Sequence, residues 1–460
     1  MTQDLLVGIE AFGFYIPKNY LPIEVLANER NIDPAKLTVG LGLKNMAVCS
    51  PNETVDYMAA QAIIQLNEFH KLQQNRGLDF DKIDRVYLGT ESSIDSAKPT
   101  ITFAKPIIEK ELNVDTSAVD YLDMTFACIG AVDALLACLD YVQINPDRQC
   151  IIVASDEAKY DVKTGGEYTQ GAGAVALLIS SNPKIMSINS RKVGVDTSND
   201  FDFYKPLRKF TKTQILEELK SHLPDSIDLS AISTALNSQE TQFNDGNLEG
   251  IVSSFWNLPE ENIKIHRKQP VFDGKLSNNC YQNRIERALE RFQAKSNTPL
   301  SDYEAWIFHL PYAYQGRRIA VKYWWNKLAL TNPSITEAIK QEIGENEDSQ
   351  QFYKLLSKHP TYKKFVADCI EPSERASSEI GNMYTASILM AAISHLVFGK
   401  YQEQSKVLFL AYGSGSKAKV FSGEIQNSSS KNILLNLYEN QLFNRNQINY
   451  STYLEWHRSN

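Results

Sequence analysis

Cys128 combines a reactive side chain with a position that favours catalysis. It follows Thr125–Ala127 and opens an apolar pattern of helical spacing, Cys128–Val142. The N-terminus of a helix presents unpaired N–H groups and the positive end of the helix dipole, and both stabilise a thiolate. The same N–H groups could hold the oxyanion that forms when a thiolate attacks a thioester. Position alone leaves open a nucleophilic cysteine or a packed core cysteine.

Two further side chains, Glu91 and His309, each follow an apolar strand. Glu91 comes just after Arg85–Gly89, where a carboxylate could serve as a general base or simply stand near a helix start. His309 follows Ala305–Phe308, and Pro311 stops the strand behind it. A neutral imidazole there could donate to a carbonyl oxygen, or it could be a satisfied strand-end histidine.

Two glycine-rich turns and one arginine pair are candidates for ligand binding. The turns, Gly165–Gly173 and Tyr412–Ser416, would let the backbone approach a ligand closely, or would only join adjacent strands. Neither has the spacing of a Walker loop. Arg317 and Arg318 follow His309 and could meet phosphates, although exposed arginine pairs are commonly just solvated.

The remaining cysteines show no metal-binding or redox spacing. They do not form a CxxC motif, and each is expected to be a small buried side chain. We therefore expect no metal site. These cysteines are Cys49, Cys138, Cys150, Cys280 and Cys369.

The elements that would position these residues occur in the same order in both halves of the chain. In the first half we expect strands at Val7–Ile16, Arg85–Gly89, Cys150–Ala154 and Ala172–Ile179, and helices at Asp56–Leu72 and Cys128–Val142. In the second half we expect strands at Ala305–Phe308, Lys406–Ala411 and Ala418–Ile425, and a helix at Gly381–Phe398. The matching order indicates a duplicated α/β unit, and ligands of such sheets gather at strand ends.

Charge and hydropathy exclude several classes of protein. Lys and Arg number 47 against 55 Asp and Glu, and a net charge of -8 argues against a nucleic-acid binder with a basic face. No apolar run approaches the ~18 residues of a membrane span. The N-terminus lacks the basic and apolar regions of a secretory signal. We therefore expect a cytoplasmic protein with neither nucleic-acid nor membrane partners.

Eight short motifs, taken together, resemble the hydroxymethylglutaryl-CoA synthase family. In chain order they are TESSIDSAKP, FAC, GGEYTQGAGAVALLI, DFYKP, VFDGKLSNNCY, FHLPY, GNMYTAS and AYGSGS. The resemblance implies a thiolase-like fold, a duplicated α/β unit in a five-layer α-β-α-β-α stack with extra helical insertions. It implies an N-terminal half at 1–185 and a C-terminal half at 301–460 with a helical insertion at about 326–376. A connecting region at 186–300 would carry an insertion at about 211–268.

The resemblance also implies a reaction and a role for each matching residue. Acetyl-CoA would condense with acetoacetyl-CoA and water to give 3-hydroxy-3-methylglutaryl-CoA in the mevalonate pathway. Cys128 would carry the acetyl group, Glu91 would remove a methyl proton, and His309 would donate to the ketone oxygen or orient the acyl-CoA. The CoA thioesters are substrates, so no cofactor is expected. The implied substrate contacts are Thr169, Ser277, Asn382 and Ser414, with Arg318 near the CoA phosphates.

The sequence departs from the family pattern at three places near these contacts. Tyr168 replaces a common proline, Tyr314 replaces a common lysine, and Gly165 stands where a polar residue is frequent. These departures bear on CoA binding and leave the three catalytic roles in place.

Three alternative functions stay open at this point, and one oligomeric state is expected. A β-branching synthase of the same family would accept acyl groups from an acyl carrier protein. A thiolase or ketoacyl synthase would use different residues beside the nucleophile, and the context of Glu91 does not match them. A non-catalytic acyl-CoA-binding scaffold would be expected to lack Cys128, Glu91 or His309. Because thiolase-fold proteins pair through their sheets, we expect a homodimer.

Overall fold

The computed structural model describes residues 5–222, 262–344 and 349–459, together with residues 224, 228, 234 and 346. The chain forms two compact units. The main unit consists of Met1–Phe203 and Phe272–Asn460, and the second consists of Tyr204–Val271.

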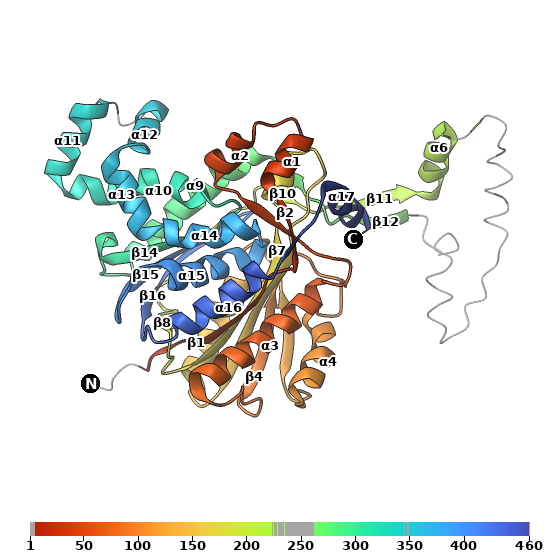
Figure 1. Cartoon of the computed structure of the whole chain (residues 1–460), viewed down its shortest axis with the longest axis horizontal. Coiled ribbons are helices and arrows are strands. Elements are labelled where there is room, and N and C mark those ends of the chain that lie inside the picture. The colour runs from red at the N-terminus through yellow and green to blue at the C-terminus, as the bar shows by residue number, and fades with distance from the viewer. Residues whose placement is uncertain are drawn as a thin grey trace. The chain divides into compact units, whose positions relative to one another are not determined.

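One ten-stranded sheet runs through the main unit. Its order is β14-β15-β16-β8-β1-β7-β6-β4-β5, with β9 pairing alongside β16 (Figure 1). Strands β4, β5 and β6 are parallel, whereas β7 and β1 run antiparallel to their neighbours. The short strand β8 pairs with both β1 and β16 and so joins the strands on its two sides into one sheet. The bounds are β1 Val7–Tyr15, β4 Ile83–Gly89, β5 Asp120–Met124, β6 Gln149–Glu157, β7 Ala172–Ser181, β8 Met186–Ile188, β9 Gly194–Thr197, β14 Tyr303–Phe308, β15 Lys406–Gly413 and β16 Lys417–Ile425.

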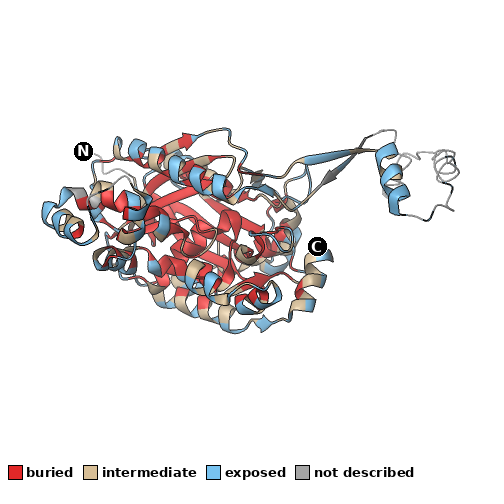
Figure 2. Ribbon diagram, turned by 90° about the horizontal axis from the view of Figure 1, so that it is seen from above, coloured by how far each residue is buried: buried red, intermediate tan, exposed pale blue. Residues whose placement is uncertain are grey.

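The apolar runs that predict strands form the buried centre of this sheet. Every residue of β1 is buried, and so is every residue of β7 except the last. Figure 2 shows this buried core, drawn in red, passing through the strands. Continuous apolar runs are typical of strands covered on both faces, so the predicted strands are confirmed to within a few residues.

Helices of the main unit cover the sheet. Helix α3 packs on β1 and β7, α5 on β4 and β6, α9 on β9 and β16, and α15 on β14 and α14. The helices are α1 Ile23–Glu29, α2 Pro34–Leu41, α3 Val55–Gln74, α4 Ile101–Leu112, α5 Gly130–Ile144, α9 Gly274–Gln293, α10 Gln315–Tyr323, α11 Pro333–Ile343, α12 Gln350–Leu356, α13 Pro360–Cys369, α14 Glu371–Ile380, α15 Ser387–Phe398, α16 Lys431–Phe443 and α17 Tyr450–Ser459. A small sheet joins β2 Asn19–Pro22, β3 Asn45–Val48 and β17 Asn446–Gln447.

Two predicted helix starts are wrong in the same way. Helix α5 begins at Gly130, two residues after Cys128, and α15 begins at Ser387, five residues after Asn382. In each case a non-glycine residue with positive φ interrupts the helical backbone: Ala127 at 38° and Tyr384 at 44°. Cys128 and Asn382 therefore lie in the turns that lead into the two apolar helices.

One helical stretch is more apolar than we expected from the sequence. Ala127–Ile144 is long and apolar enough to cross a membrane by length and composition, the single such stretch in the described parts of the chain. However, 61% of it is buried inside the protein. It contains α5, which packs on the central strands, so its apolar character belongs to the core.

The described residues of the second unit include a two-stranded ribbon and a helix. Strand β11, Leu207–Thr211, pairs antiparallel with β12, Asn262–His266, and α6 spans Lys212–His222. Most of the predicted insertion at 211–268 lies outside the described residues. The stretch 326–376 contains α11, α12, α13 and the first part of α14.

Candidate active site

Cys128 and Glu91 meet at the end of β4. An added Cβ at Gly89 would lie 2.1 Å from the backbone nitrogen of Ala131, so glycine is required where the start of α5 approaches this strand. This close approach brings the thiol to the carboxylate. The Cys128 Sγ donates to Oε1 of Glu91 at 3.3 Å.

The Cys128 thiol lies in a small cluster of mostly apolar side chains. Cys128 is 8% exposed and packs with Ala158, Tyr160, Phe203 and Tyr384. Burial is the main cause that raises the pKa of Tyr160, and the nearby Cys128 and Glu91 add to it. A nucleophile in such a site is shielded from water, which strengthens electrostatic interactions around it.

A fully buried carboxylate, Asp156 near the end of β6, connects Glu91 to a turn more than 200 residues away in the sequence. Its Oδ1 accepts from Thr90 Oγ1 at 2.8 Å and from the Glu91 backbone N–H at 2.9 Å. Its Oδ2 accepts from the Thr385 backbone N–H at 3.0 Å and from the Thr385 hydroxyl. Asp156 thus holds the backbone of Glu91 against the turn that carries Asn382.

His309 is buried and electrically neutral. It follows β14 directly. Its backbone N–H donates to the carbonyl oxygen of Leu410 at 3.1 Å, and its backbone carbonyl accepts from the Tyr281 hydroxyl at 2.6 Å. Among the described residues, its Nδ1 has no hydrogen-bond partner. Burial lowers the pKa of His309 to about 3, so the imidazole stays neutral at ordinary pH. The pKa of Tyr281 is raised mainly by burial and further by Tyr323 and Cys128, and its ring centre lies 6.3 Å from that of His309.

Thr169 and Asn382 meet through their backbones. The Asn382 N–H donates to Thr169 O at 2.9 Å. An added Cβ at Gly171 would lie 2.4 Å from Ile380 O, and Gly381 has a φ of 85°, so both turns depend on glycine here. The Asn382 Oδ1 accepts from the Tyr384 N–H at 2.9 Å and from the Ser387 hydroxyl at 3.0 Å, which orients this side chain.

Ser414 lies in the turn between β15 and β16, next to the Cys128 loop. A Cβ at Gly413 would lie 2.9 Å from Phe126 O and 2.8 Å from Cγ2 of Ile129, so this turn packs directly against the residues that flank Cys128. The buried Asp202 holds the turn, because its carboxylate accepts from the Tyr412 hydroxyl at 3.0 Å and from the Gly415 N–H at 2.9 Å.

Ser277 and Arg318 are not in contact with the cysteine–carboxylate pair. Ser277 lies in the first turn of α9, where its N–H donates to Asp273 O at 2.8 Å. The exposed Arg318 donates to Gly40 O at 2.7 Å and to the Tyr312 hydroxyl at 3.3 Å.

The departure at Tyr314 has a packing explanation. Its ring fills the space beside Gly42, where a Cβ would lie 2.5 Å from the ring. The Arg317 guanidinium stacks 3.9 Å from the centre of the same ring and pairs with the buried Glu374. The Arg317 guanidinium is therefore occupied by Tyr314 and Glu374, and Arg318 is the exposed member of the pair.

Sequence analysis missed Asp156, Asp202 and Tyr281. Asp156 follows the apolar run of β6 just as Glu91 and His309 follow theirs, so the strand-end pattern could have identified it. Asp202 and Tyr281 lie within the motifs DFYKP and VFDGKLSNNCY, but the sequence analysis gave neither residue a role of its own. Within the described parts of the chain, no group of three or more His, Cys, Asp or Glu side chains could hold a metal ion.

Comparison with known proteins places these residues in a family. The N-terminal model of hydroxymethylglutaryl-coenzyme A synthase matches residues 3–184, and the C-terminal model of the same family matches residues 262–457. The hydroxymethylglutaryl-CoA synthase of Enterococcus faecalis is 26% identical over 442 residues, which cover 95% of this chain and 88% of the relative. That of Haloferax volcanii is 25% identical over 468 residues, which cover 97% and 90%.

Solved structures agree with the fold. MvaS in complex with 3-hydroxy-3-methylglutaryl coenzyme A has a TM-score of 0.72 and 23% identity, covering 99% of this chain and 92% of that one. The HMG synthase of the curacin biosynthetic pathway has a TM-score of 0.71 and 18% identity, covering 98% and 88%. The thiolase-like fold predicted from the sequence is thereby confirmed. With both family models matched across most of its length, this chain belongs to the hydroxymethylglutaryl-coenzyme A synthase family.

Proposed function

We propose that this protein condenses acetyl-CoA with acetoacetyl-CoA and water to give 3-hydroxy-3-methylglutaryl-CoA and free CoA, as a step of the mevalonate pathway. The observation that carries the proposal is the 3.3 Å contact between the Cys128 thiol and the Glu91 carboxylate in a largely apolar site. A Claisen-type condensation needs a nucleophile and a base this close together. No cofactor takes part, since both CoA thioesters are substrates.

The reaction proceeds in three steps on the chain's own residues. The Cys128 thiolate attacks the acetyl carbonyl, the carbon–sulfur bond to CoA breaks, and CoA leaves with a proton. Glu91 then removes a proton from the acetyl methyl group, that carbon attacks the ketone carbon of acetoacetyl-CoA, and the protonated Glu91 returns its proton to the ketone oxygen. Water finally cleaves the bond to Cys128, which releases the product and restores the thiol.

The neutral His309 serves the second step. An imidazole whose pKa is lowered to about 3 by burial donates an N–H to the ketone oxygen without placing a fixed positive charge in the site. We assign the acyl-thioester contacts to Asn382 and Ser414, further substrate contacts to Thr169 and Ser277, and the CoA phosphates to Arg318. Arg318 suits that role because it is the exposed arginine of its pair.

The first test is acetylation of the cysteine. After incubation with acetyl-CoA, mass spectrometry should find one acetyl group on the Cys128 peptide, and Cys128→Ala should lose both this adduct and product formation. Cys49→Ala is the matched control, because Cys49 is also a buried cysteine outside the thiol–carboxylate contact. Acetyl-enzyme in the Cys128→Ala variant would show that the nucleophile is misassigned.

A β-branching activity is the second candidate, because structures of the curacin HMG synthase in complex with a donor acyl carrier protein resemble this chain. In the comparison of structures, identity is 18% to that protein and 23% to MvaS in complex with 3-hydroxy-3-methylglutaryl coenzyme A, which favours the CoA substrates. Acetyl-CoA and acetyl-carrier protein should be compared as acetyl donors. Faster acetylation of Cys128 by the carrier protein would favour the second candidate. A non-catalytic scaffold is disfavoured because Cys128, Glu91 and His309 are all present.

We further propose that the protein is a cytoplasmic homodimer. Within each chain, residues 1–185 and 301–460 would form the two thiolase-like halves. A relative from Gallus gallus, 25% identical, is named as cytoplasmic. Each proposed half holds one catalytic turn, at Cys128 and at Asn382, just before an apolar helix. Strand β5 ends the sheet and exposes Leu122, which suits pairing with a second copy.

Light scattering at micromolar concentration tests the dimer. We expect twice the mass of one chain, and Leu122→Lys should shift the mass toward the monomer because it places a charge on the proposed contact. Val39→Lys, at another exposed apolar position, should leave the mass unchanged. A monomeric wild-type protein would contradict the proposal.

A further inference from the structure

We infer that the C-terminal helix α17 is a positioning element of the active site, acting through Tyr453 and His457 on the backbone that carries Tyr160 and Thr169. The inference rests on the proposed function, since it assigns these residues a part in the geometry of that reaction. None of the residues of α17 touches Cys128 or Glu91 through any contact described above.

His457 holds the backbone of Tyr160 directly. Its Nε2 lies 3.0 Å from Tyr160 O and 3.3 Å from Oε1 of Gln170. Both partners are acceptors, so Nε2 is the protonated nitrogen that donates to them. The same Gln170 Oε1 accepts from the Tyr160 N–H at 2.7 Å. Both polar groups of the Tyr160 backbone are therefore held by one small network that His457 completes.

Tyr453 holds the turn that carries Thr169. Its hydroxyl donates to Oε1 of Glu167 at 3.0 Å and accepts from Nε2 of Gln170 at 3.1 Å. Glu167 is 1% exposed and also pairs with Arg30. A buried network of this kind constrains geometry strongly, because each unpaired member would carry a large desolvation cost.

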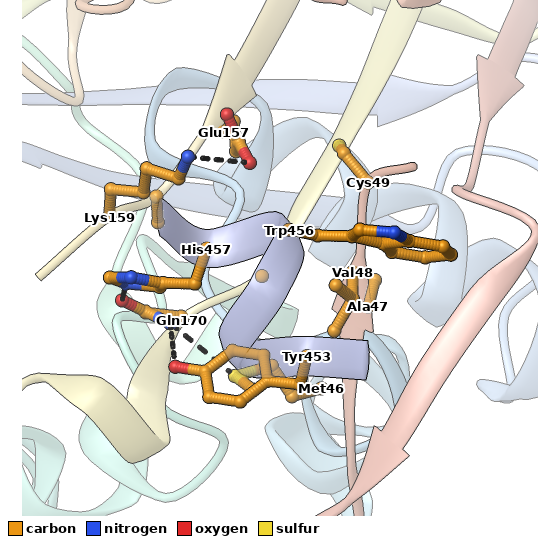
Figure 3. A pocket seen from close by; sticks show the side chains of 12 residues that line it. Met46, Ala47, Val48, Cys49, Glu157, Lys159, Gln170, Tyr453, Trp456 and His457 are labelled. Atoms are coloured by element: carbon orange, nitrogen blue, oxygen red, sulfur yellow. Dashed lines mark hydrogen bonds and ion pairs between the residues drawn. The ribbon is translucent and has the colours of Figure 1, made fainter. Parts of the chain in front are cut away.

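The side chains that make these contacts share one face of α17. Tyr450, Tyr453 and His457 are spaced by three and four residues, and the Tyr450 hydroxyl accepts from Arg30. Figure 3 shows Tyr453 and His457 reaching toward Gln170 beside a small cavity that Lys159 also lines. The helix therefore acts as one unit on the segment from Tyr160 to Gln170.

That segment reaches the reacting residues. The Tyr160 ring packs edge-on against Phe203 and Tyr384, with ring centres 6.3 and 6.4 Å apart, and Cys128 belongs to the same cluster. At the other end of the segment, Gln170 forms a backbone bridge with Asn382. A shift of α17 would therefore move the wall beside Cys128 and the turn at Asn382 together.

The test compares two substitutions of one residue. His457→Leu removes the donor, whereas His457→Gln keeps an N–H at nearly the same distance along the side chain, and the cavity leaves room for it. Misplacing a reacting group by about 1 Å can cost ~10²-fold in rate, so kcat should fall at least about tenfold in His457→Leu with KM changed far less. His457→Gln should stay near the wild-type kcat.

His359→Leu is the matched control. His359 is another hydrogen-bonded histidine, whose Nδ1 accepts from the Thr361 N–H at 3.2 Å and whose Nε2 lies 3.0 Å from Glu342. These partners lie on α11 and α13, so this variant loses comparable contacts without touching the segment from Tyr160 to Gln170. Its kcat should equal that of the wild type.

A second readout does not depend on the substrate. Alkylation of Cys128 by iodoacetamide should be several-fold faster in His457→Leu, because the Tyr160 ring no longer covers the thiol, and unchanged in His457→Gln and His359→Leu. Should His457→Leu fail to fold, Tyr453→Phe, which keeps the ring and removes only the hydroxyl, should raise the alkylation rate in the same direction. Equal alkylation rates and equal kcat values across the folded variants would overturn the inference. A wild-type protein that does not condense acetyl-CoA, but shows this alkylation pattern, would contradict the proposed function alone.

Discussion

At the scale of single residues, the contact between Cys128 and Glu91 bears on the order in which the carboxylate would meet the thiol and the acetyl group. While the thiol is protonated, its proton points at the carboxylate 3.3 Å away. In the proposed reaction, that proton would be gone once the sulfur carries an acetyl group, and the acetyl methyl group would become the nearest acid. One carboxylate can therefore face first the thiol and then the carbon acid without moving.

Substitution of Glu91 can distinguish the role of the base from that of the nucleophile. In Glu91→Gln, acetylation of Cys128 should survive, because removing a nearby negative charge favours the thiolate. Condensation should fall by ~10²–10⁴-fold, which is the usual worth of positioned proton transfer. The measurement pairs acetyl-enzyme, by mass spectrometry, with consumption of acetoacetyl-CoA.

The control for this pair is Glu111→Gln, which changes an exposed carboxylate on α4 and should alter neither assay. If acetylation and condensation collapse together in a folded Glu91→Gln protein, Glu91 maintains the site and is not the condensation base. If neither changes, its assigned role is wrong.

At the scale of elements, glycines decide how closely the catalytic turns approach one another. Because Gly89 has no side chain, the start of α5 can lie against the end of β4. In the same way, Gly171 lets its own turn lie against the turn at Asn382, and Gly413 lets the β15–β16 turn lie against the Cys128 loop. In each case a neighbouring backbone atom would lie within 3 Å of an added Cβ. Helices and strands thus bring the reactive residues near, and the glycines set the final distances.

Gly413→Ala should disturb this arrangement. Its Cβ would lie 2.9 Å from Phe126 O and 2.8 Å from Cγ2 of Ile129, so the residues on both sides of Cys128 must shift. Overpacking of this kind costs about 1–3 kcal/mol of stability, and kcat should fall with it. Denaturant unfolding and steady-state kinetics measure the two effects.

Gly40→Ala provides the comparison. Its Cβ would lie 3.8 Å from Ala35 O, an ordinary contact, and the residue is within α2. Alanine is the better helix former, so this variant should be as stable as the wild type or up to about 1 kcal/mol more stable. Equal kinetics and stability in Gly413→Ala and Gly40→Ala would contradict the role given to the β15–β16 turn.

At the scale of the whole molecule, buried histidines make stability depend on pH. Burial lowers the pKa of His309 to about 3 and that of His395 to about 4. The unfolded chain takes up these protons near pH 6.5, whereas the folded protein does not, so stability falls as the pH drops below about 6.5. Glu374, whose pKa burial raises to about 7, acts in the opposite direction between its unfolded value and pH 7.

The contribution of His309 can be isolated by difference. Between pH 6 and pH 4 the free energy of unfolding of the wild type should fall faster than that of His309→Asn, by up to ~1.4 kcal/mol per pH unit for one proton. His395 and Glu374 are present in both proteins and cancel. Parallel pH profiles would mean that His309 is protonated in the folded state.

Much of this arrangement follows from local patterns. Continuous apolar runs located the central strands because residues buried on both faces of a sheet must be apolar along its whole length. The strand-end rule then selected Glu91 and His309, and would also have selected Asp156. The two helix starts were predicted wrongly, because Ala127 and Tyr384 adopt a positive φ although neither is a glycine, so the sequence does not mark where the helix is interrupted.

By itself, the sequence determined the order of strands and apolar helices, the residue types able to do chemistry and the family to which their motifs point. Only the tertiary structure decided that Thr169 meets Asn382, that Asp156 joins Glu91 to Thr385, and that α17 returns to hold Tyr160. Local periodicity records whether a side chain is buried, since burial acts on each residue separately. It does not record which distant residue lies opposite, because that depends on the packing of complete elements: His457 and Gln170 are 287 positions apart, yet they share one hydrogen-bond network.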